Sequence, residues 1–441
     1  MNNKYQQLSK LLFFVFISVV QLFISYSHIK DSFIIAPIVL LSIVMRWLLL
    51  KRIHLSSDLT LIFTYIFLEL SSFPTLVLYS YFENIDIHSN SIISLSMIPI
   101  ALLALKVLKG KLPKNELRLE FKNSQSFYFL SFYSMTALAV VLTIISYKLG
   151  ITKMGVPHPV LPFKLEPALN ITRIMVLPLI LCSLIASIAH KSGKFKAILP
   201  TVFYIAWSCV EMYARGSRGV VFFNSLPLLC FYALNFKLTA RRIAPLFFIV
   251  PGILLTFFIG DFFRNLEVSK VDSSQSKPSI AKTFSLKTVT TMYTRVFAEG
   301  LVLNKIIQSK EKTENKEVLR KMSSVEFHTV EVDKSKDTTT HSSGITLISD
   351  GYFHYNLFGC FLALILAGLL AILNDAFFLT KKIYHPLFIC FLVFIFNKIN
   401  WGDGLLDFYI SRSFFTISAF PLTICAIILL IYKPSQLQEK W

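Results

Sequence analysis

The sequence lacks the residue patterns that build disulfide frameworks and the commonest catalytic sites. It contains six cysteines, no CxxC pair, and no Walker, GxGxxG, HExxH or GxSxG motif in a suitable context. Every cysteine lies inside an apolar run: Cys182, Cys209, Cys230, Cys360, Cys390 and Cys425. No acidic cluster resembling a metal site stands beside a predicted span. We therefore expect no disulfides, no cofactor and metal-independent chemistry.

Acidic residues are also scarce. The chain has 25 Asp and Glu against 44 Lys and Arg, which gives a net charge of +19. In a soluble protein this balance would suggest nucleic-acid binding. Here most basic residues flank apolar runs, so anionic lipid headgroups and membrane orientation explain the charge better. We expect membrane lipids, and no nucleic acid, among the partners.

Apolar residues are abundant, at 54% of the 441 residues, and the mean hydropathy is +0.63. They fall in runs of roughly 18 to 24 residues, the length that crosses a bilayer as a helix. They do not alternate in segments of about 10 residues, as the strands of a membrane barrel would. The sequence therefore predicts an all-α polytopic membrane protein, with residues 1–441 forming a single integral membrane domain.

We expect about twelve transmembrane helices. The predicted spans are 10–28, 33–50, 59–82, 92–109, 127–148, 172–190, 196–213, 219–235, 243–263, 351–373, 385–400 and 412–432. The first run has no small-residue cleavage site followed by a soluble chain, so we interpret it as a retained helix rather than a signal peptide.

The distribution of basic residues predicts the orientation. Alternate connections are rich in Lys and Arg: 51–58, 105–126, 190–196, 236–242 and 374–384. The positive-inside rule places these connections and both termini in the cytoplasm. The opposite side then holds 149–171, 213–218, 397–411 and one long loop, 264–350, with a helical pattern from about 284 to 308. We expect this loop to fold over the membrane domain as a lid or partly ordered cap.

Two arginines in the stretch "MYARGSRGVVFF" stand on the side where the charge rule disfavours them. Arg215 and Arg218 lie between two apolar runs, in a connection of a few residues. A guanidinium matches the geometry of phosphate, and Gly216 and Gly219 permit a close approach of the backbone. A helix starting near Gly219 would add free N–H groups. The alternative is that both arginines extend to lipid headgroups, with a pair to Glu211.

The long loop and the segment after it hold further candidates. Arg295 and Glu299 are four residues apart and would share one helix face, as a site or as an ordinary surface pair. His341, in "TTTHSSG", could take a proton from a hydroxyl, and His354, in "DGYFHYNLFG" beside Tyr352, is the alternative. A solvated loop histidine is the simpler interpretation of His341.

Two other outward segments carry charge. In 397–411 and at the start of the last span, Asp403 and Arg412 could contact a sugar or neutralise other charges, or form a solvated hairpin. In 149–171, Lys153 and Lys164 stand among four prolines that forbid a regular helix. These lysines could bind an anionic headgroup.

Across residues 150–420 the chain resembles the Wzy-type polysaccharide repeat-unit polymerases, which include the O-antigen polymerases. The resemblance rests on "GSRGVVFF", "YTRVFAEGLVL", "HSSGITLISDGYFHYNLFGCF" and "GDGLLDFYISRSFF" in this order, and more loosely on "LPFKLEPALNITRIMVLP". It implies a GT-C-like glycosyltransferase of the bacterial inner membrane, with 264–350 as a periplasmic loop.

The resemblance also implies a reaction. Such enzymes transfer a growing chain from undecaprenyl pyrophosphate to a new lipid-linked repeat unit. On the matching motifs, the resemblance implies that Arg218 and Arg295 bind the pyrophosphate and that Arg215 assists them. His341 matches the segment that carries the base. A chain-length regulator and a flippase would be partners.

Two other functions remain open. An O-antigen ligase would use the same donor with a different acceptor. A lipid-linked oligosaccharide flippase would carry charges within its spans and two similar halves. We find no internal repeat, and Arg46 and Glu69 are the main charges within spans.

Overall fold

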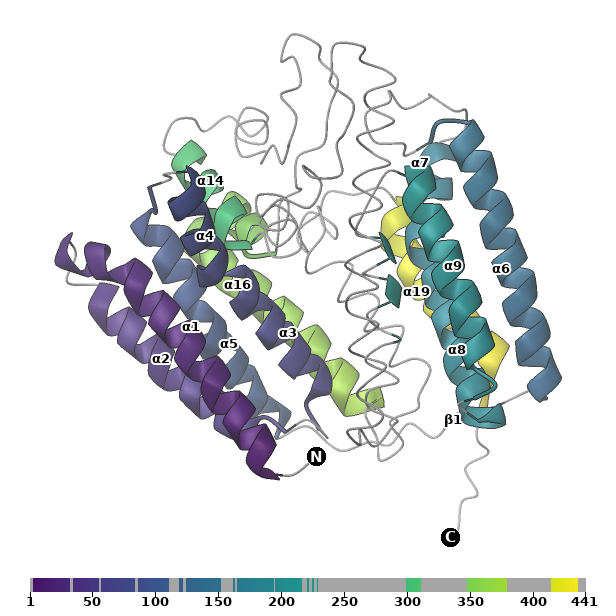
Figure 1. Cartoon of the computed structure of the whole chain (residues 1–441), viewed down its shortest axis with the longest axis horizontal. Helices are drawn as coiled ribbons and strands as arrows, with labels where there is room; N and C mark the ends of the chain where they lie inside the picture. The colour runs from purple at the N-terminus through teal and green to yellow at the C-terminus, as the bar shows by residue number, and fades with distance from the viewer. Residues whose placement is uncertain are drawn as a thin grey trace, which may run out of the picture.

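In a computed structural model, the described part of the chain is built from α-helices and one short pair of strands (Figure 1). It describes residues 3–31, 35–54, 57–83, 86–110, 119–121, 124–151, 162, 165–193, 195–215, 220–221, 224–225, 228, 299–310, 347–378 and 414–434. Within these residues, six helical segments are long and apolar enough to cross a membrane. They are Gln7–Tyr26, Leu59–Leu78, Ser89–Lys109, Gln125–Lys148, Ala168–Ser192 and Leu347–Leu373. The helical character expected from the sequence is therefore confirmed, and these segments are compatible with a polytopic membrane protein.

The helices follow the apolar runs closely. In chain order they are α1 (Asn3–Asp31), α2 (Ile35–Arg52), α3 (Leu59–Ser71), α4 (Phe73–Glu83), α5 (Ser89–Lys109), α6 (Gln125–Lys148), α7 (Leu165–Ile171), the π-helical turn η2 (Thr172–Val176), α8 (Leu177–Ser192), α9 (Ile198–Arg215), α14 (Glu299–Lys310), α16 (Leu347–Phe378) and α19 (Phe414–Ile431). Predicted spans 243–263 and 385–400, and nearly all of 219–235, lie outside the described residues.

The described helices pack in two groups (Figure 1). Helices α1 to α5 pack with α14 and α16, and α6 to α9 pack with α19. Large apolar side chains remain exposed along α1 and α6; Phe23 is 73% exposed and Leu130 is 69% exposed. A lipid bilayer would cover such faces, because only hydrocarbon accommodates this much apolar surface without cost.

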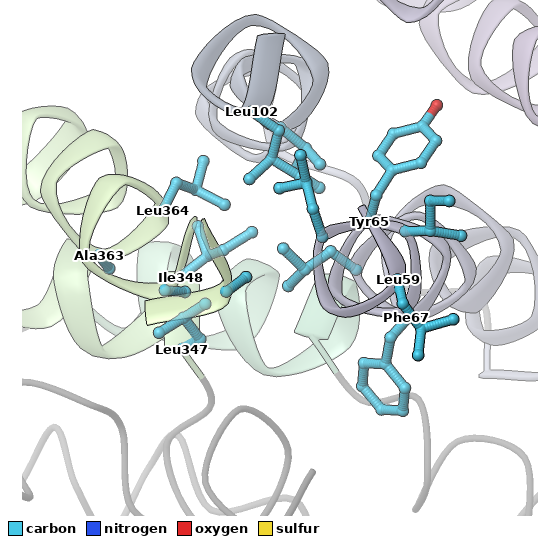
Figure 2. Close-up of a cluster of buried hydrophobic side chains, with 14 of the residues drawn as sticks. Leu59, Tyr65, Phe67, Leu102, Leu347, Ile348, Ala363 and Leu364 are labelled. Carbon is cyan, nitrogen blue, oxygen red and sulfur yellow. The ribbon is translucent and has the colours of Figure 1, made fainter. Parts of the chain in front are cut away.

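The core of the first group forms where α3, α5 and α16 meet (Figure 2). Leu59 and Phe67 of α3, Leu102 of α5, and Leu347 and Leu364 of α16 are buried there. Leu347 and Leu364 come from two separate stretches of α16 that lie side by side. Burying side chains of this size against one another stabilises packing through dispersion.

A buried ion pair joins α2 to α3 in this group. Arg46 Nε lies 3.0 Å from Glu69 Oε1, and Arg46 Nη2 donates to Glu69 Oε2 at 3.2 Å. Arg46 Nη1 also donates to Gln21 Oε1 at 2.8 Å and to Ser18 Oγ at 3.3 Å, which brings in α1. Both charged side chains are fully buried. The bidentate geometry and the extra hydrogen bonds satisfy two charges that would otherwise be costly at this depth.

A second charged cluster in the same group lies between the start of α3 and the last turn of α5. Asp58 Oδ1 lies 2.6 Å from Lys106 Nζ and 3.0 Å from Lys109 Nζ. Burial alone would raise the pKa of Asp58, but hydrogen bonds from Lys106 and from the backbone of His54, with the charge of Lys109, hold it below its usual value.

Asp375, near the end of α16, completes this cluster. It accepts hydrogen bonds from the backbone N–H groups of Thr60 at 2.9 Å and Leu61 at 3.2 Å, and Lys109 lies 3.4 Å away. Burial raises the pKa of Asp375 to about 6, against the attraction of Lys109. The end of α16 thus caps the start of α3, where helix N–H groups have no partner within the helix.

The two strands tie distant parts of the chain together. Strand β1 (Leu119–Phe121) pairs antiparallel with β2 (Tyr432–Pro434), and Tyr128 Oη donates to Ile431 O at 2.9 Å. Residues 119–121 and 432–434 therefore lie at the same end of the molecule. The sequence predicts that both segments are cytoplasmic.

Helix α16 is interrupted near its start. Tyr355 and Asn356 leave the helical conformation, and Asn356 has φ 56° and ψ −141°. We call residues 347–354 the short arm and residues 357–378 the long arm of α16. Gly351 and Gly359 bring the two arms into backbone contact, since a Cβ on either glycine would collide with the backbone of the other. Only glycine permits this approach.

Helix α14 lies within the predicted loop 264–350, yet it is packed into the membrane domain. Gly300 lies against the carbonyl of Ser72, where α3 ends and α4 begins. That break has a local cause, because Pro74 cannot donate the hydrogen bond that would continue α3. Asn304 Oδ1 accepts from His88 N at 2.8 Å and Ser91 Oγ at 2.7 Å at the start of α5. Helix α14 is thus largely buried against the helices of the first group.

Candidate functional site

An ion pair joins Arg173 of η2 to Glu211 of α9 in the second group. Arg173 Nη2 lies 2.8 Å from Glu211 Oε1, and Arg173 Nε donates to Oε2 at 3.3 Å. Thr143 Oγ1 donates to the same Oε2 at 2.7 Å, and Trp207 Nε1 donates to Thr143 Oγ1 at 3.2 Å. Both charged side chains are 1% exposed. The pair is therefore fixed by helices α6, α9 and the η2 turn together.

The π-helical turn η2 places Arg173 in this pair. Leu177 N–H donates to Thr172 O, five residues back, so the turn holds one more residue than an α-helical turn. The next residue, Pro178, has no N–H to restore the α-helical register. Single π-turns are frequent at functional sites because they redirect one side chain. Here the redirected side chain is an arginine inside an apolar run.

Arg215, the last residue of α9, lies one turn beyond Glu211. Its guanidinium is within electrostatic range of both Glu211, which attracts it, and Arg173, which repels it. Its Nε atom is buried and has no hydrogen-bond partner within the described residues. Arg173 thus pairs with this carboxylate and Arg215 lies within electrostatic range of it, so the three groups carry a net charge of +1. An excess of positive charge among these described residues favours an anionic ligand.

The surroundings of this arginine cluster fit a membrane boundary. Tyr147 of α6 and Tyr213 of α9 form a ring pair with centroids 5.9 Å apart, and both side chains are exposed. Tyrosine is enriched at the level of lipid headgroups. Arg215 follows Tyr213 by two residues, so the cluster lies next to these exposed rings in the sequence of α9.

A second set of predicted residues gathers on α14 and the short arm of α16. Glu299, which is 1% exposed, accepts hydrogen bonds from the backbone N–H groups of Ile348 at 2.7 Å and Ser349 at 3.0 Å. On the short arm, His354 Nε2 lies 3.5 Å from Asp350 Oδ1. The Asp350 side chain is fully buried and the His354 side chain is 20% exposed. Tyr352 is also buried.

The predicted site residues therefore separate into three sets. Arg215 lies in the second helical group, beside Arg173. Glu299, Tyr352 and His354 lie together in the first group. The other predicted residues lie outside the described residues: Arg218, Arg295, His341, Lys153, Lys164, Asp403 and Arg412.

Sequence reasoning missed Arg173 and Lys310. Arg173 stands in "NITRIMVLP", within an apolar run, and an arginine there is itself a signal of a polar contact inside the membrane domain. Glu211 stands in "SCVEMYA" and gives the same signal. Pairing the two requires knowing that α6, α8 and α9 pack together, which the sequence does not state. Lys310 carried no comparable signal, because it lies in a charged stretch.

Within the described residues, no group of three or more His, Cys, Asp or Glu side chains is arranged to hold a metal ion. In the comparisons with known proteins, no family model, no curated protein and no solved structure matches this chain.

Proposed function

We propose that the protein polymerises undecaprenyl-pyrophosphate-linked oligosaccharide repeat units, transferring the growing chain to a new lipid-linked unit. The observation that carries the proposal is the arginine cluster of Arg173, Glu211 and Arg215, with a buried Nε of Arg215 that has no partner within the described residues. The proposal includes twelve spans, a GT-C-like architecture, and a bacterial inner membrane location with both termini cytoplasmic. A chain-length regulator and a flippase are its expected partners.

The chemistry of the transfer needs such a cluster. The acceptor hydroxyl oxygen forms a bond to the anomeric carbon of the donor sugar and gives its proton to a base, for which His341 is the candidate that the resemblance implies. The bond from that carbon to the pyrophosphate oxygen breaks, and the electron pair goes to the pyrophosphate. Guanidinium donors held in place beforehand stabilise this growing negative charge. Arg215 supplies such donors, and Arg218, three residues further along, is positioned by sequence to add to them.

The arrangement of the segments supports the proposed sidedness. The α7 helix, the end of α4 and α14 lie at the upper end of the molecule in Figure 1, and β1 and the start of α1 lie towards the lower end. The described parts of the segments predicted to face the periplasm thus lie at one end. The ends of α2 and α8, which border the basic connections 51–58 and 190–196, lie at the opposite end.

The flippase is less well supported. Arg46 and Glu69, the main charges within spans, neutralise each other and are fully buried. They hold helices together and present no charge to a passing substrate. An O-antigen ligase remains compatible with the same arginine cluster, since it would release the same pyrophosphate.

Lipopolysaccharide from a strain lacking the gene tests the proposal. A polymerase deletion leaves core carrying a single repeat unit, and the wild-type gene restores the ladder. Core without any repeat unit would indicate the ligase. An unchanged ladder would exclude both.

A further inference from the structure

The first turn of the short arm of α16 is capped by a side chain from a different helix. Glu299 Oε1 accepts from the backbone N–H groups of Ile348 and Ser349, which belong to the first turn of the short arm. The first N–H groups of a helix have no partner within it, and the helix dipole makes this end positive. A buried carboxylate is the complementary group for that end.

The last turn of the short arm is capped by Lys310, the last residue of α14, which is the helix that also carries Glu299. Lys310 Nζ donates to the carbonyls of Tyr352 and Phe353, at 3.1 Å each, and to Asn356 Oδ1 at 2.6 Å. It also lies 5.4 Å from the centroid of the Tyr352 ring. These carbonyls form the negative end of the short arm, which favours a cation.

Helix α14 and the short arm therefore run parallel and are joined at both ends. Glu299 is the first residue of α14 and Lys310 is the last, so one rigid helix of 12 residues spans the short arm. Each charge matches the helix end that it contacts rather than the other charge. Gly351 and Gly359 fix the opposite side of the short arm against the long arm.

We propose that Glu299 and Lys310 are positioning residues that hold the short arm so that its Asp350–His354 pair faces the saccharide of the lipid-linked substrate. Asp350 is buried and orients the partly exposed His354, whose ring offers hydrogen bonds to sugar hydroxyls. The charged groups around His354 on the described elements are Asp350 beside it and Lys310 of α14 beyond Tyr352. This inference rests on the proposed function for the identity of the saccharide.

The test uses the full-length protein in nanodiscs and four variants. Glu299→Gln and Lys310→Met each remove one end of the contact, and the double variant Glu299→Lys/Lys310→Glu reverses both. Gln308→Ala is the matched control, because Gln308 lies on α14 but donates to Asp86 O rather than to the short arm. The substrate is the lipid-linked repeat unit extracted from the deletion strain.

Two measurements are made on each variant. Amide hydrogen exchange of residues 348–354 is expected to accelerate roughly tenfold in both single variants and to stay unchanged in the control. The double reversal is expected to be worse than either single variant, since it places each charge at the wrong helix end. KM for the lipid-linked unit is expected to rise about tenfold, with a smaller change in kcat, in the single variants.

Each outcome decides a separate point. Unchanged exchange in Glu299→Gln and Lys310→Met would overturn the contact as a positioning device. Recovery in the double reversal would show that the two charges pair with each other. Faster exchange with an unchanged KM would overturn the role in substrate positioning. Absence of the repeat unit from the deletion strain would refute the proposed function and leave the exchange result standing. Lys310 is the last residue of α14, so the Lys310→Met variant remains informative if the Glu299→Gln variant fails to fold.

Discussion

Glu211 and Arg173 face each other between α9 and η2, with 2.8 Å between Oε1 and Nη2 and almost no exposure to solvent. The two residues are far apart in the sequence, and each interrupts an apolar run. Glu211 therefore pairs with an arginine from another helix, and the Nε atom of Arg215 has no hydrogen-bond partner within the described residues.

Substitutions at the Glu211–Arg173 pair distinguish an effect on stability from an effect on activity. Glu211→Gln is expected to lower the stability by about 3 to 5 kcal/mol, because Arg173 stays buried without its counter-ion. The double variant Arg173→Met/Glu211→Met removes both charges and is expected to fold nearly as stably as the wild type, yet to form no ladder. Thermal unfolding in detergent and lipopolysaccharide gels measure the two properties. A full ladder in the double variant would show that the pair serves only the fold.

Arg215 is expected to act on the reaction rather than on stability. Arg215→Lys keeps the charge but loses the planar fork, so activity is expected to fall roughly 100-fold while thermal stability changes little. We expect the same of Arg218→Lys. Arg52→Lys, at the exposed end of α2 on the opposite side, is the control and should leave the ladder intact. Full activity in Arg215→Lys would instead indicate an arginine that only contacts headgroups.

The Arg46–Glu69 pair is expected to be structural. Arg46→Met alone leaves Glu69 charged and buried, and is expected to cost about 3 to 5 kcal/mol of stability. Arg46→Met/Glu69→Met is expected to recover most of that loss and to retain the full ladder. Unfolding temperature and ladder length are the measurements. Loss of the ladder in a well-folded double variant would revive a role for these charges in moving a substrate.

The raised pKa of Asp375 predicts that the stability of the protein depends on pH. Its pKa in the folded protein is about 6, above the ordinary value of 3.8, so the folded state binds this proton more tightly than the unfolded state. Its contribution to stability is therefore fully present below about pH 4 and is lost as the pH rises to about 6. Asp375→Asn lacks this titration. We expect the stability of the wild type relative to Asp375→Asn to fall between pH 4 and 6, measured by thermal unfolding in detergent. A difference independent of pH would contradict the assignment.

The sequence predicts the helices well because the signal is local. An apolar run such as 127–148 specifies a helix by its length and composition, and α6 covers it. The break between α3 and α4 was missed within the predicted span 59–82, although Pro74 is a visible cause. The burial of α14 could not be predicted, because Glu299 and Asn304 are polar. Their partners at 348–349 and at 88–91 are identified only by the packed structure.

The candidate site was predicted in part for the same reason. The sequence identifies Arg215 by its unusual position, and a pair with Glu211 is the alternative interpretation of that arginine. In the structure Glu211 pairs with Arg173, which the π-helical turn η2 carries. Local sequence could not reveal that an arginine from another helix binds this carboxylate.

Several polar groups of the early helices have hydrogen-bond partners that are synthesised later. The first N–H groups of α3 are capped only once Asp375 has been synthesised. The groups around the start of α5 that bond to Asn304 depend on a later residue in the same way, and so does β1, which pairs with β2. During translation, the early helices thus enter the membrane with polar groups that only the later part of the chain can satisfy. A chain that ends before residue 375 would leave the N–H groups of Thr60 and Leu61 without the carboxylate that caps them in the full-length protein.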